Sequence, residues 1–289
     1  MSINILEKEY NISDNNPLNK HDIPDDTTHL IFYKYFNQKI KPNILPNFIQ
    51  HLTFDVASKF NQEIGKNVLP NFIQRLTFGA HFNQEICENV LPNSIQYLRF
   101  GVYYNQEIKP NILPNLLTHL YFGYHYDQEI KPNVLPNSIT HLTFGFQYDQ
   151  EICENVLPNS ITHLTFVNNF NMKNILPNSI THLTFGWNFN QKIKPNYLPN
   201  SITHLTFGNK FNQEIKPKWL PNSIIHLTFG CLFNQSLDNL PYGLKFLTLV
   251  ENKQPLTNLP LSLEILEIKK VNKDNDIKLP YGCELIIKN

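Results

Sequence analysis

The sequence predicts a mainly β repeat solenoid, in which about 13 rungs of about 22 residues stack into a curved parallel sheet with few or no long helices. Three observations lead to this fold class. A Leu-Pro-Asn motif recurs at near-constant spacing, a short stretch of alternating apolar and polar residues follows each motif, and the composition is poor in helix formers. The 289 residues include only two alanines, beside 20 prolines and 21 phenylalanines, so long helices are not expected.

The repeat is anchored by the proline of Leu-Pro-Asn or of a close variant. The spacing between successive anchors is 22 residues in most units and ranges from 19 to 24. The anchors are Pro24, Pro46, Pro70, Pro92, Pro114, Pro136, Pro158, Pro177, Pro199, Pro221, Pro241, Pro260 and Pro280. A unit this short cannot bury its own apolar face, whereas stacked copies can, which predicts a solenoid.

Each unit contains one predicted strand after its anchor. Residues 203–207 read Thr-His-Leu-Thr-Phe, and this period of two is typical of a half-buried strand. Leu205 and Phe207 are expected to point inward. His204 and Thr206 are expected to point outward. The same pattern predicts strands near residues 29–32, 51–54, 75–78 and 97–100, and at the equivalent residues of later units.

A second aromatic position in each unit is expected to stack on itself as a spine inside the solenoid. Its residues are Phe36, Phe60, Phe82, Tyr104, Tyr126, Tyr148, Phe170, Phe189, Phe211 and Phe233. An asparagine or aspartate follows each ring, and its side chain can bond backbone groups that the sheet does not reach. We therefore expect a ladder of these polar side chains beside the spine.

The repeated motif resembles the FNIP repeat, a relative of the leucine-rich repeat (LRR). The motif reads Phe-Asn-Gln-x-Ile and then Leu-Pro-Asn-Ser-Ile-Thr-His-Leu-Thr-Phe-Gly, and the resemblance covers about residues 23–289. It implies an LRR-like solenoid of a kind found mostly in social amoebae and in giant viruses of amoebae. The sequence departs from the family pattern where glutamate or lysine, in place of proline, follows Phe-Asn-Gln, which leaves the local turn open.

Two segments are predicted, an N-terminal cap or extension at residues 1–22 and the repeat solenoid at residues 23–289. Relatives can carry an N-terminal F-box that recruits a ubiquitin ligase. Twenty-two residues are too few for that domain, so the sequence does not support this link.

Composition and charge exclude several classes of partner. The 24 basic and 24 acidic residues balance, whereas a nucleic-acid binder should show a basic face. No apolar stretch is long enough for a membrane span, and the N-terminus lacks the features of a signal peptide. The four cysteines form no C-x-x-C motif, and free thiols fit a reducing compartment. We expect a cytoplasmic protein, in the host cytoplasm if it is viral.

Histidines form the most conspicuous candidate site, a ladder on the outward side of consecutive strands. Its members are His119, His141, His163, His182, His204 and His226. Adjacent imidazoles could chelate a metal. A structural site requires four ligands, however, and no cysteine or carboxylate lies among the histidines of the ladder. The sequence therefore predicts no metal site and no cofactor, and duplication of the repeat accounts for the ladder.

The function expected from the residues is a non-enzymatic scaffold for an unknown protein partner. No catalytic motif occurs, and the glutamates recur with the repeat instead of standing out from it. Directly after the strand, two positions vary between units and place large aromatic residues at Tyr124, Phe146 and Trp187, which are the candidate partner contacts. Packing or neutral variation could also explain these three. The alternative function is a solenoid that binds or cleaves carbohydrate.

Overall fold

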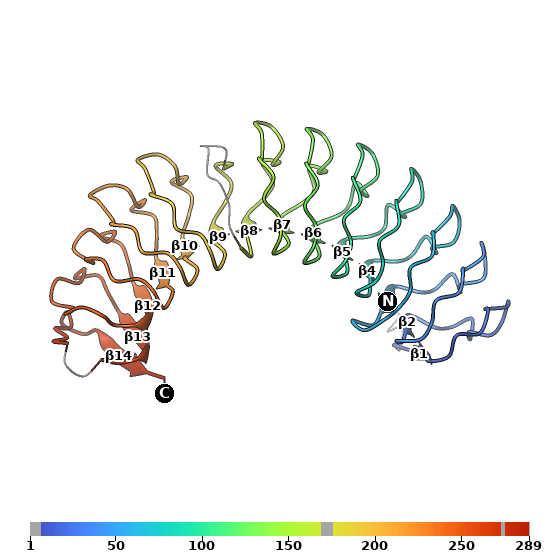
Figure 1. Ribbon diagram of the computed structural model, residues 1–289, viewed down its shortest axis with the longest axis horizontal. Coiled ribbons are helices and arrows are strands. Elements are labelled where there is room, and N and C mark those ends of the chain that lie inside the picture. Colours follow the sequence, from blue (N-terminus) through green and yellow to red (C-terminus); the bar gives the residue numbers. More distant parts are fainter. Residues whose placement is uncertain (1–6, 169–175, 273–274, 289) are drawn as a thin grey trace, which may run out of the picture. The chain divides into compact units, whose positions relative to one another are not determined.

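A computed structural model of the chain describes residues 7–168, 176–272 and 275–288 (Figure 1). The chain divides into two compact units, Met1–Ser160 and Ile161–Asn289, which we call unit 1 and unit 2. The expected spine ring at Phe170 lies outside the described residues, as does part of the stretch between Pro158 and Pro177, where the anchor spacing is 19 residues. In Figure 1 the strands of each unit lie along one edge of the rungs and the long loops along the other.

Fourteen strands are described, and the strands of each unit pair in parallel with their neighbours in chain order. Unit 1 contains β1 (Glu9–Ile12), β2 (His29–Phe32), β3 (His51–Phe54), β4 (Arg75–Thr77), β5 (Tyr97–Arg99), β6 (His119–Tyr121) and β7 (His141–Thr143). Unit 2 contains β8 (His163–Thr165), β9 (His182–Thr184), β10 (His204–Thr206), β11 (His226–Phe229), β12 (Phe246–Glu251), β13 (Ile265–Lys270) and β14 (Glu284–Ile287). The described residues form no helix, hence none that could cross a membrane. The predicted mainly β solenoid is confirmed.

The strand positions agree with the sequence pattern. β2 and β3 coincide with the predicted ranges, while β4 and β5 end one residue early. The pairing nevertheless continues, because the backbone N–H of Phe78 donates to the carbonyl of Arg99 at 2.9 Å. β1 is a strand that the repeat did not predict, since no Leu-Pro-Asn precedes it, and it pairs in register with β2.

Register places equal residues of neighbouring rungs side by side. His204 lies opposite His182 on one side and His226 on the other, and Leu205 likewise pairs with Leu183 and Leu227. Leu205 and Phe207 are each 1% exposed, as the alternation predicted. The strand phenylalanine packs on the spine ring of its own rung, with 3.9 Å between the ring centroids of Phe207 and Phe211. Stacked apolar residues thus form a continuous core in each unit.

Neighbouring rungs lie closer together at the outer strand face than at the spine. In unit 2, the rings of His182 and His204 on the outer strand face are 4.0 Å apart, whereas those of Phe211 and Phe233 in the spine are 6.1 Å apart. In unit 1 the corresponding centroid distances are 4.1 Å for His119–His141 and 6.1 Å for Tyr104 and its neighbour Phe82. Within each unit, such wedge-shaped rungs curve the sheet, with the outward strand face on the inside of the bend.

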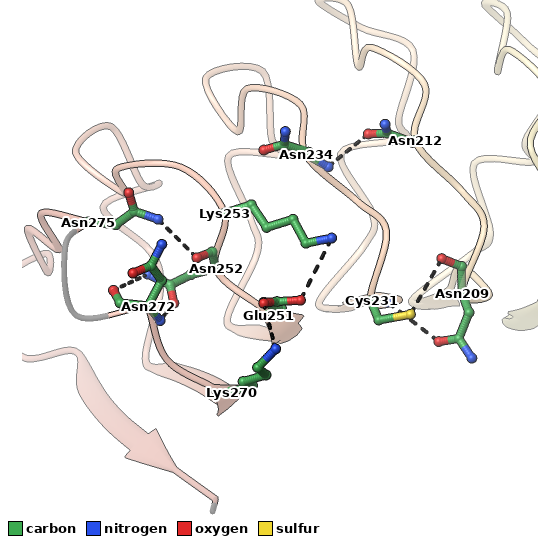
Figure 2. Close-up of polar contacts among 10 residues, drawn as sticks. All are labelled: Asn209, Asn212, Cys231, Asn234, Glu251, Asn252, Lys253, Lys270, Asn272 and Asn275. Atoms are coloured by element: carbon green, nitrogen blue, oxygen red, sulfur yellow. Dashed lines mark hydrogen bonds and ion pairs between the residues drawn. The ribbon is translucent and has the colours of Figure 1, made fainter.

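The predicted polar ladder runs beside the spine. Oδ1 of Asn83 accepts from the backbone N–H of Asn105 at 2.9 Å and from Nε2 of Gln106 at 3.0 Å. Figure 2 shows a step of the same ladder in unit 2, where Oδ1 of Asn212 accepts from the backbone N–H of Asn234 at 2.8 Å. In seven rungs the asparagine or aspartate after the ring therefore satisfies backbone that forms no sheet, as expected.

A second set of asparagines holds a left-handed backbone turn before seven of the Leu-Pro motifs. Their φ values are 60–66°, at Asn43, Asn67, Asn89, Asn111, Asn133, Asn155 and Asn196. Asparagine tolerates this region better than other residues with a side chain. Lys218 has the same φ of 65° in unit 2, so its rung keeps the turn at a cost in backbone strain.

Three consecutive spine positions in unit 1 are tyrosines, and their hydroxyl groups are buried. Tyr104 and Tyr126 are fully buried and Tyr148 is 3% exposed, yet none of the three hydroxyls has a hydrogen-bond partner among the described residues. Burial raises the pKa of Tyr126 well above its ordinary value, with a further rise from Tyr104 and Tyr148. A buried hydroxyl without a partner is destabilising, so the tyrosines of this part of the spine contribute less to stability than phenylalanines at the same positions would.

Candidate functional site

All six predicted ladder histidines lie half-buried on the outward strand face. Unit 1 carries His119 and His141, and unit 2 carries the other four. Neighbouring rings within a unit stack nearly in parallel, with centroids 4.0–4.1 Å apart and interplanar angles of 11–14°. The ladder is therefore a stack of imidazoles.

The threonine before each histidine fixes the ring. Its hydroxyl hydrogen-bonds Nδ1 of the next residue at 2.9 Å in five rungs, for example between Thr181 and His182 and between Thr203 and His204. His226 follows Ile225 and lacks this bond. Since Nδ1 is engaged, Nε2 is the ring nitrogen left to face solvent.

Burial lowers the pKa of four ladder histidines, His119, His182, His204 and His226. It lowers the pKa of His182, and it lowers the pKa of His204 to about 4, with further contributions from His182, His226 and His163. Burial also lowers the pKa of His119, where the second cause is the charge of Arg75. For His204, loss of solvation is the larger cause and repulsion from the neighbouring imidazoles the smaller one.

The stacked geometry does not favour metal binding. Rings that lie face to face direct their nitrogens along parallel lines and not toward a common point. Among residues 7–168, 176–272 and 275–288, no three histidine, cysteine, aspartate or glutamate side chains come together as a metal site would require.

The structure brings two of the three predicted partner contacts together. The rings of Tyr124 and Phe146 stack with centroids 4.8 Å apart and an interplanar angle of 7°, and Tyr124 remains 45% exposed. Trp187 occupies the equivalent position in unit 2 and is 55% exposed. Tyr124 and Trp187 are thus exposed aromatics of their own units, and Phe146 is half-buried.

A second row beside this pair was not singled out from the sequence. Tyr103 stacks on His125 with centroids 5.1 Å apart, and Nδ1 of His125 lies 2.8 Å from Oε1 of Gln147. Tyr103 is 48% exposed. The available signal was that these residues fill the second of the two variable positions after the strand.

A glycine positions both rows by letting successive turns approach closely. A Cβ added at Gly123 would lie 1.7 Å from the carbonyl oxygen of Gly101, so only glycine fits there. The residues after this glycine position lie at the surface beyond the strand, Tyr103 after β5 and Tyr124 after β6. Tight stacking of these turns explains why the exposed aromatics contact each other.

A groove of about 310 Å³ follows the C-terminal ends of β3 to β6 in unit 1. Its walls include Asp55, Val56, Arg99, Val102 and Tyr124. Asp55 and Val56 lie directly after β3, in the repeat whose anchors Pro46 and Pro70 are 24 residues apart instead of 22. The groove thus adjoins the exposed aromatic rows.

The repeated glutamates show no preparation for acid–base catalysis. Glu85 and Glu107 are surface residues that pair with lysines of the next rung, Lys109 at 2.6 Å and Lys131 at 2.7 Å. The hydrogen bond from Lys131 lowers the pKa of Glu107, whereas a general acid needs a raised one.

The four cysteines are all unpaired, as the sequence predicted. Cys87 and Cys153 are exposed, and Cys231 and Cys283 are half-buried. In unit 2, Sγ of Cys231 lies 3.9 Å from the carbonyl oxygen of Asn209 (Figure 2). None of the four therefore contributes a disulfide.

Comparison with protein families gives one match, the FNIP repeat. Its five matched segments are residues 15–55, 60–103, 104–147, 172–210 and 211–249, which together exceed half of the chain. No curated protein matches the chain.

Two solved structures are similar to the chain. CroV588, a giant-virus protein described as a novel circular LRR protein, is 47% identical over 96% of this chain, with a TM-score of 0.83. The match covers 42% of CroV588, so this chain spans less than half the length of that protein. YopM from Yersinia enterocolitica WA-314 is 17% identical, with a TM-score of 0.41 over 92% of this chain and 65% of YopM.

Proposed function

The chain belongs to the FNIP repeat family, and from this premise we propose that it is a non-enzymatic scaffold that binds another protein through the surface of its repeats. An LRR-like repeat protein of this kind is typical of interaction scaffolds. Its unpaired cysteines support the further proposal that it works in a reducing compartment such as the cytoplasm.

One observation carries the proposal most directly, the stacked aromatic pair formed by the exposed Tyr124 and the half-buried Phe146. The core of the rung does not require these rings, because the strand and spine aromatics already fill it. A stacked pair that remains partly accessible to solvent offers a rigid apolar surface that loses little entropy on binding. Trp187 offers the same chemistry in unit 2.

The test is affinity capture from amoebal lysate with the wild-type chain and with a triple variant, Tyr124→Ala, Phe146→Ala and Trp187→Ala. A matched control removes three other exposed aromatics, Phe48→Ala, Tyr242→Ala and Tyr281→Ala. We expect a captured protein to be lost with the first variant and kept with the control. The Tm of both variants should stay within about 3 °C of the wild type, because the rings are exposed.

Two results would overturn the proposal. Binding that survives in the first variant while its Tm falls would assign these rings to packing. Strong and selective binding on a glycan array, with no captured protein, would instead favour a carbohydrate-binding solenoid.

A further inference from the structure

The outward pattern of histidine and threonine changes on β4, β5 and β6 of unit 1. At the two outward positions of the strand, most rungs of the ladder carry histidine and threonine. β4 has Arg75 in place of the histidine, β5 has Tyr97 and Arg99 at both positions, and β6 has Tyr121 in place of the threonine. Arg75 and Arg99 are the only arginines of the chain, and both lie here.

Register brings these four residues into one patch, which we call the Arg–Tyr patch. Arg75 pairs with Tyr97, and Arg99 pairs with Tyr121. Cζ of Arg75 lies 3.8 Å from the ring centroid of Tyr97, and the rings of Tyr97 and Tyr121 are 5.0 Å apart. The two arginines are diagonal neighbours, and general sheet geometry puts such residues about 7–8 Å apart.

The positive charge of the patch is not neutralised by the protein. The outward positions of β3 to β7 carry no carboxylate, and both arginines are exposed. Among the described residues neither arginine forms an ion pair. The carboxylate in the adjoining groove, Asp55, accepts a hydrogen bond from the backbone N–H of Ala57 at 2.9 Å.

The groove next to the patch can hold a short extended segment. Arg99 lines it together with Val56, Val102 and Tyr124, so a cation and apolar side chains face the same hollow. It follows the ends of four neighbouring strands, a length of roughly 15 Å, which matches about five residues of extended chain.

We propose that the Arg–Tyr patch and this groove bind an extended acidic peptide segment of a partner protein, an inference that rests on the scaffold function proposed above. Two carboxylates of the segment bond the guanidinium groups of Arg75 and Arg99, which present fork-shaped donors suited to carboxylates. An apolar side chain between or beside them packs into the groove against Val102 and Tyr124. Arg and Tyr are also the residues enriched where binding energy concentrates.

The test uses a fluorescent probe peptide of about eight alternating glutamate and leucine residues, long enough to span the groove. Fluorescence anisotropy would compare it with an uncharged peptide of alternating glutamine and leucine. We expect the acidic peptide to bind the wild type at least about ten-fold more tightly, and to bind Arg75→Gln/Arg99→Gln about ten-fold more weakly. The matched control, Lys192→Gln/Lys210→Gln, removes the same charge from exposed sites of unit 2 and should bind like the wild type.

A charge-reversed variant makes the test independent of folding. Arg75→Glu/Arg99→Glu should reject the acidic peptide and bind a peptide of alternating lysine and leucine, which a misfolded chain would not do. Equal binding of the acidic and uncharged peptides, or unchanged binding by Arg75→Gln/Arg99→Gln, would overturn the inference. So would tighter binding of a single-stranded DNA oligonucleotide than of the acidic peptide.

The inference and the scaffold function fail separately. If Arg75→Gln/Arg99→Gln still captures the same protein from lysate, the patch is not its binding site, and the scaffold function stands. If the wild type captures no protein, the scaffold function fails.

Discussion

The two units have cores built from the same repeat positions, and they differ in the residues on their outward strand faces. On β8 to β11 of unit 2 the outward positions repeat histidine and threonine without a charged residue. Farther along unit 2, the outward carboxylate of Glu267 on β13 pairs with Lys288 at 3.0 Å. Unit 1 instead exposes Arg75 and Arg99 without ion pairs among the described residues. Register requires each inward residue to stack on its equivalent, whereas outward residues meet solvent, so recognition can be built only on the outside.

The largest expected effect tests whether the interiors are equivalent. Phe100 in unit 1 and Phe207 in unit 2 are 2% and 1% exposed at the same repeat position. Each change to alanine should lower the free energy of unfolding by about 3–5 kcal/mol, because it leaves a cavity in the core. Denaturant titration would measure both, with the outward Thr206→Ala as a control within about 0.5 kcal/mol of wild type. A cost below about 1 kcal/mol in one unit only would show that the two cores differ.

A hydroxyl exchange should give opposite signs in the two units. Tyr126→Phe removes a buried hydroxyl without a partner and should stabilise the chain by about 1 kcal/mol, while Phe211→Tyr should destabilise it by about 1–3 kcal/mol. Thermal melts of both variants provide the measurement. Destabilisation by Tyr126→Phe would mean that bound water satisfies the hydroxyl, and the spines would then be energetically alike.

A smaller reciprocal effect is expected at the left-handed turn. Lys218→Asn in unit 2 should stabilise by up to about 1 kcal/mol, and Asn133→Lys in unit 1 should cost a similar amount, since φ is 65° and 66° at these positions. Denaturation midpoints of the two variants and of wild type would give both values. Changes of the same sign would show that side-chain contacts, and not backbone strain, dominate this turn.

The smallest effect is the pH response of the ladder in unit 2, because its histidines are partly exposed. The folded pKa of His204 is lowered to about 4, against about 6.5 in an unfolded chain, and those of His182 and His226 are lowered as well. Between these values the unfolded chain binds more protons, so stability falls as the pH drops below about 6.5 and is unaffected above it. Melts between pH 7 and 5 should show a weaker response in His182→Gln/His204→Gln/His226→Gln. An equal loss in both proteins would rule out the ladder as its source.

The sequence by itself determined the repeat, the strand positions, the inward and outward faces and the spine with its polar ladder. Each of these features depends on residues that lie close together within one repeat. Because the repeat recurs many times, its local pattern is unambiguous. It also located the variable positions that carry Tyr124, Phe146 and Trp187, because a departure from a regular repeat is visible in the sequence alone.

Only the tertiary structure decided how residues of neighbouring rungs contact each other. Arg75 and Arg99 occupy different repeat positions, 24 residues apart in the chain, and only the pairing register makes them neighbours in the Arg–Tyr patch. β1 became visible through its pairing with β2, since no repeat motif marks it. Burial depends on the packing of several neighbouring rungs at once. It lowers the pKa of His204 and leaves the hydroxyls of Tyr104, Tyr126 and Tyr148 without partners among the described residues. These properties come from contacts between rungs, and the residues of a single rung do not specify them.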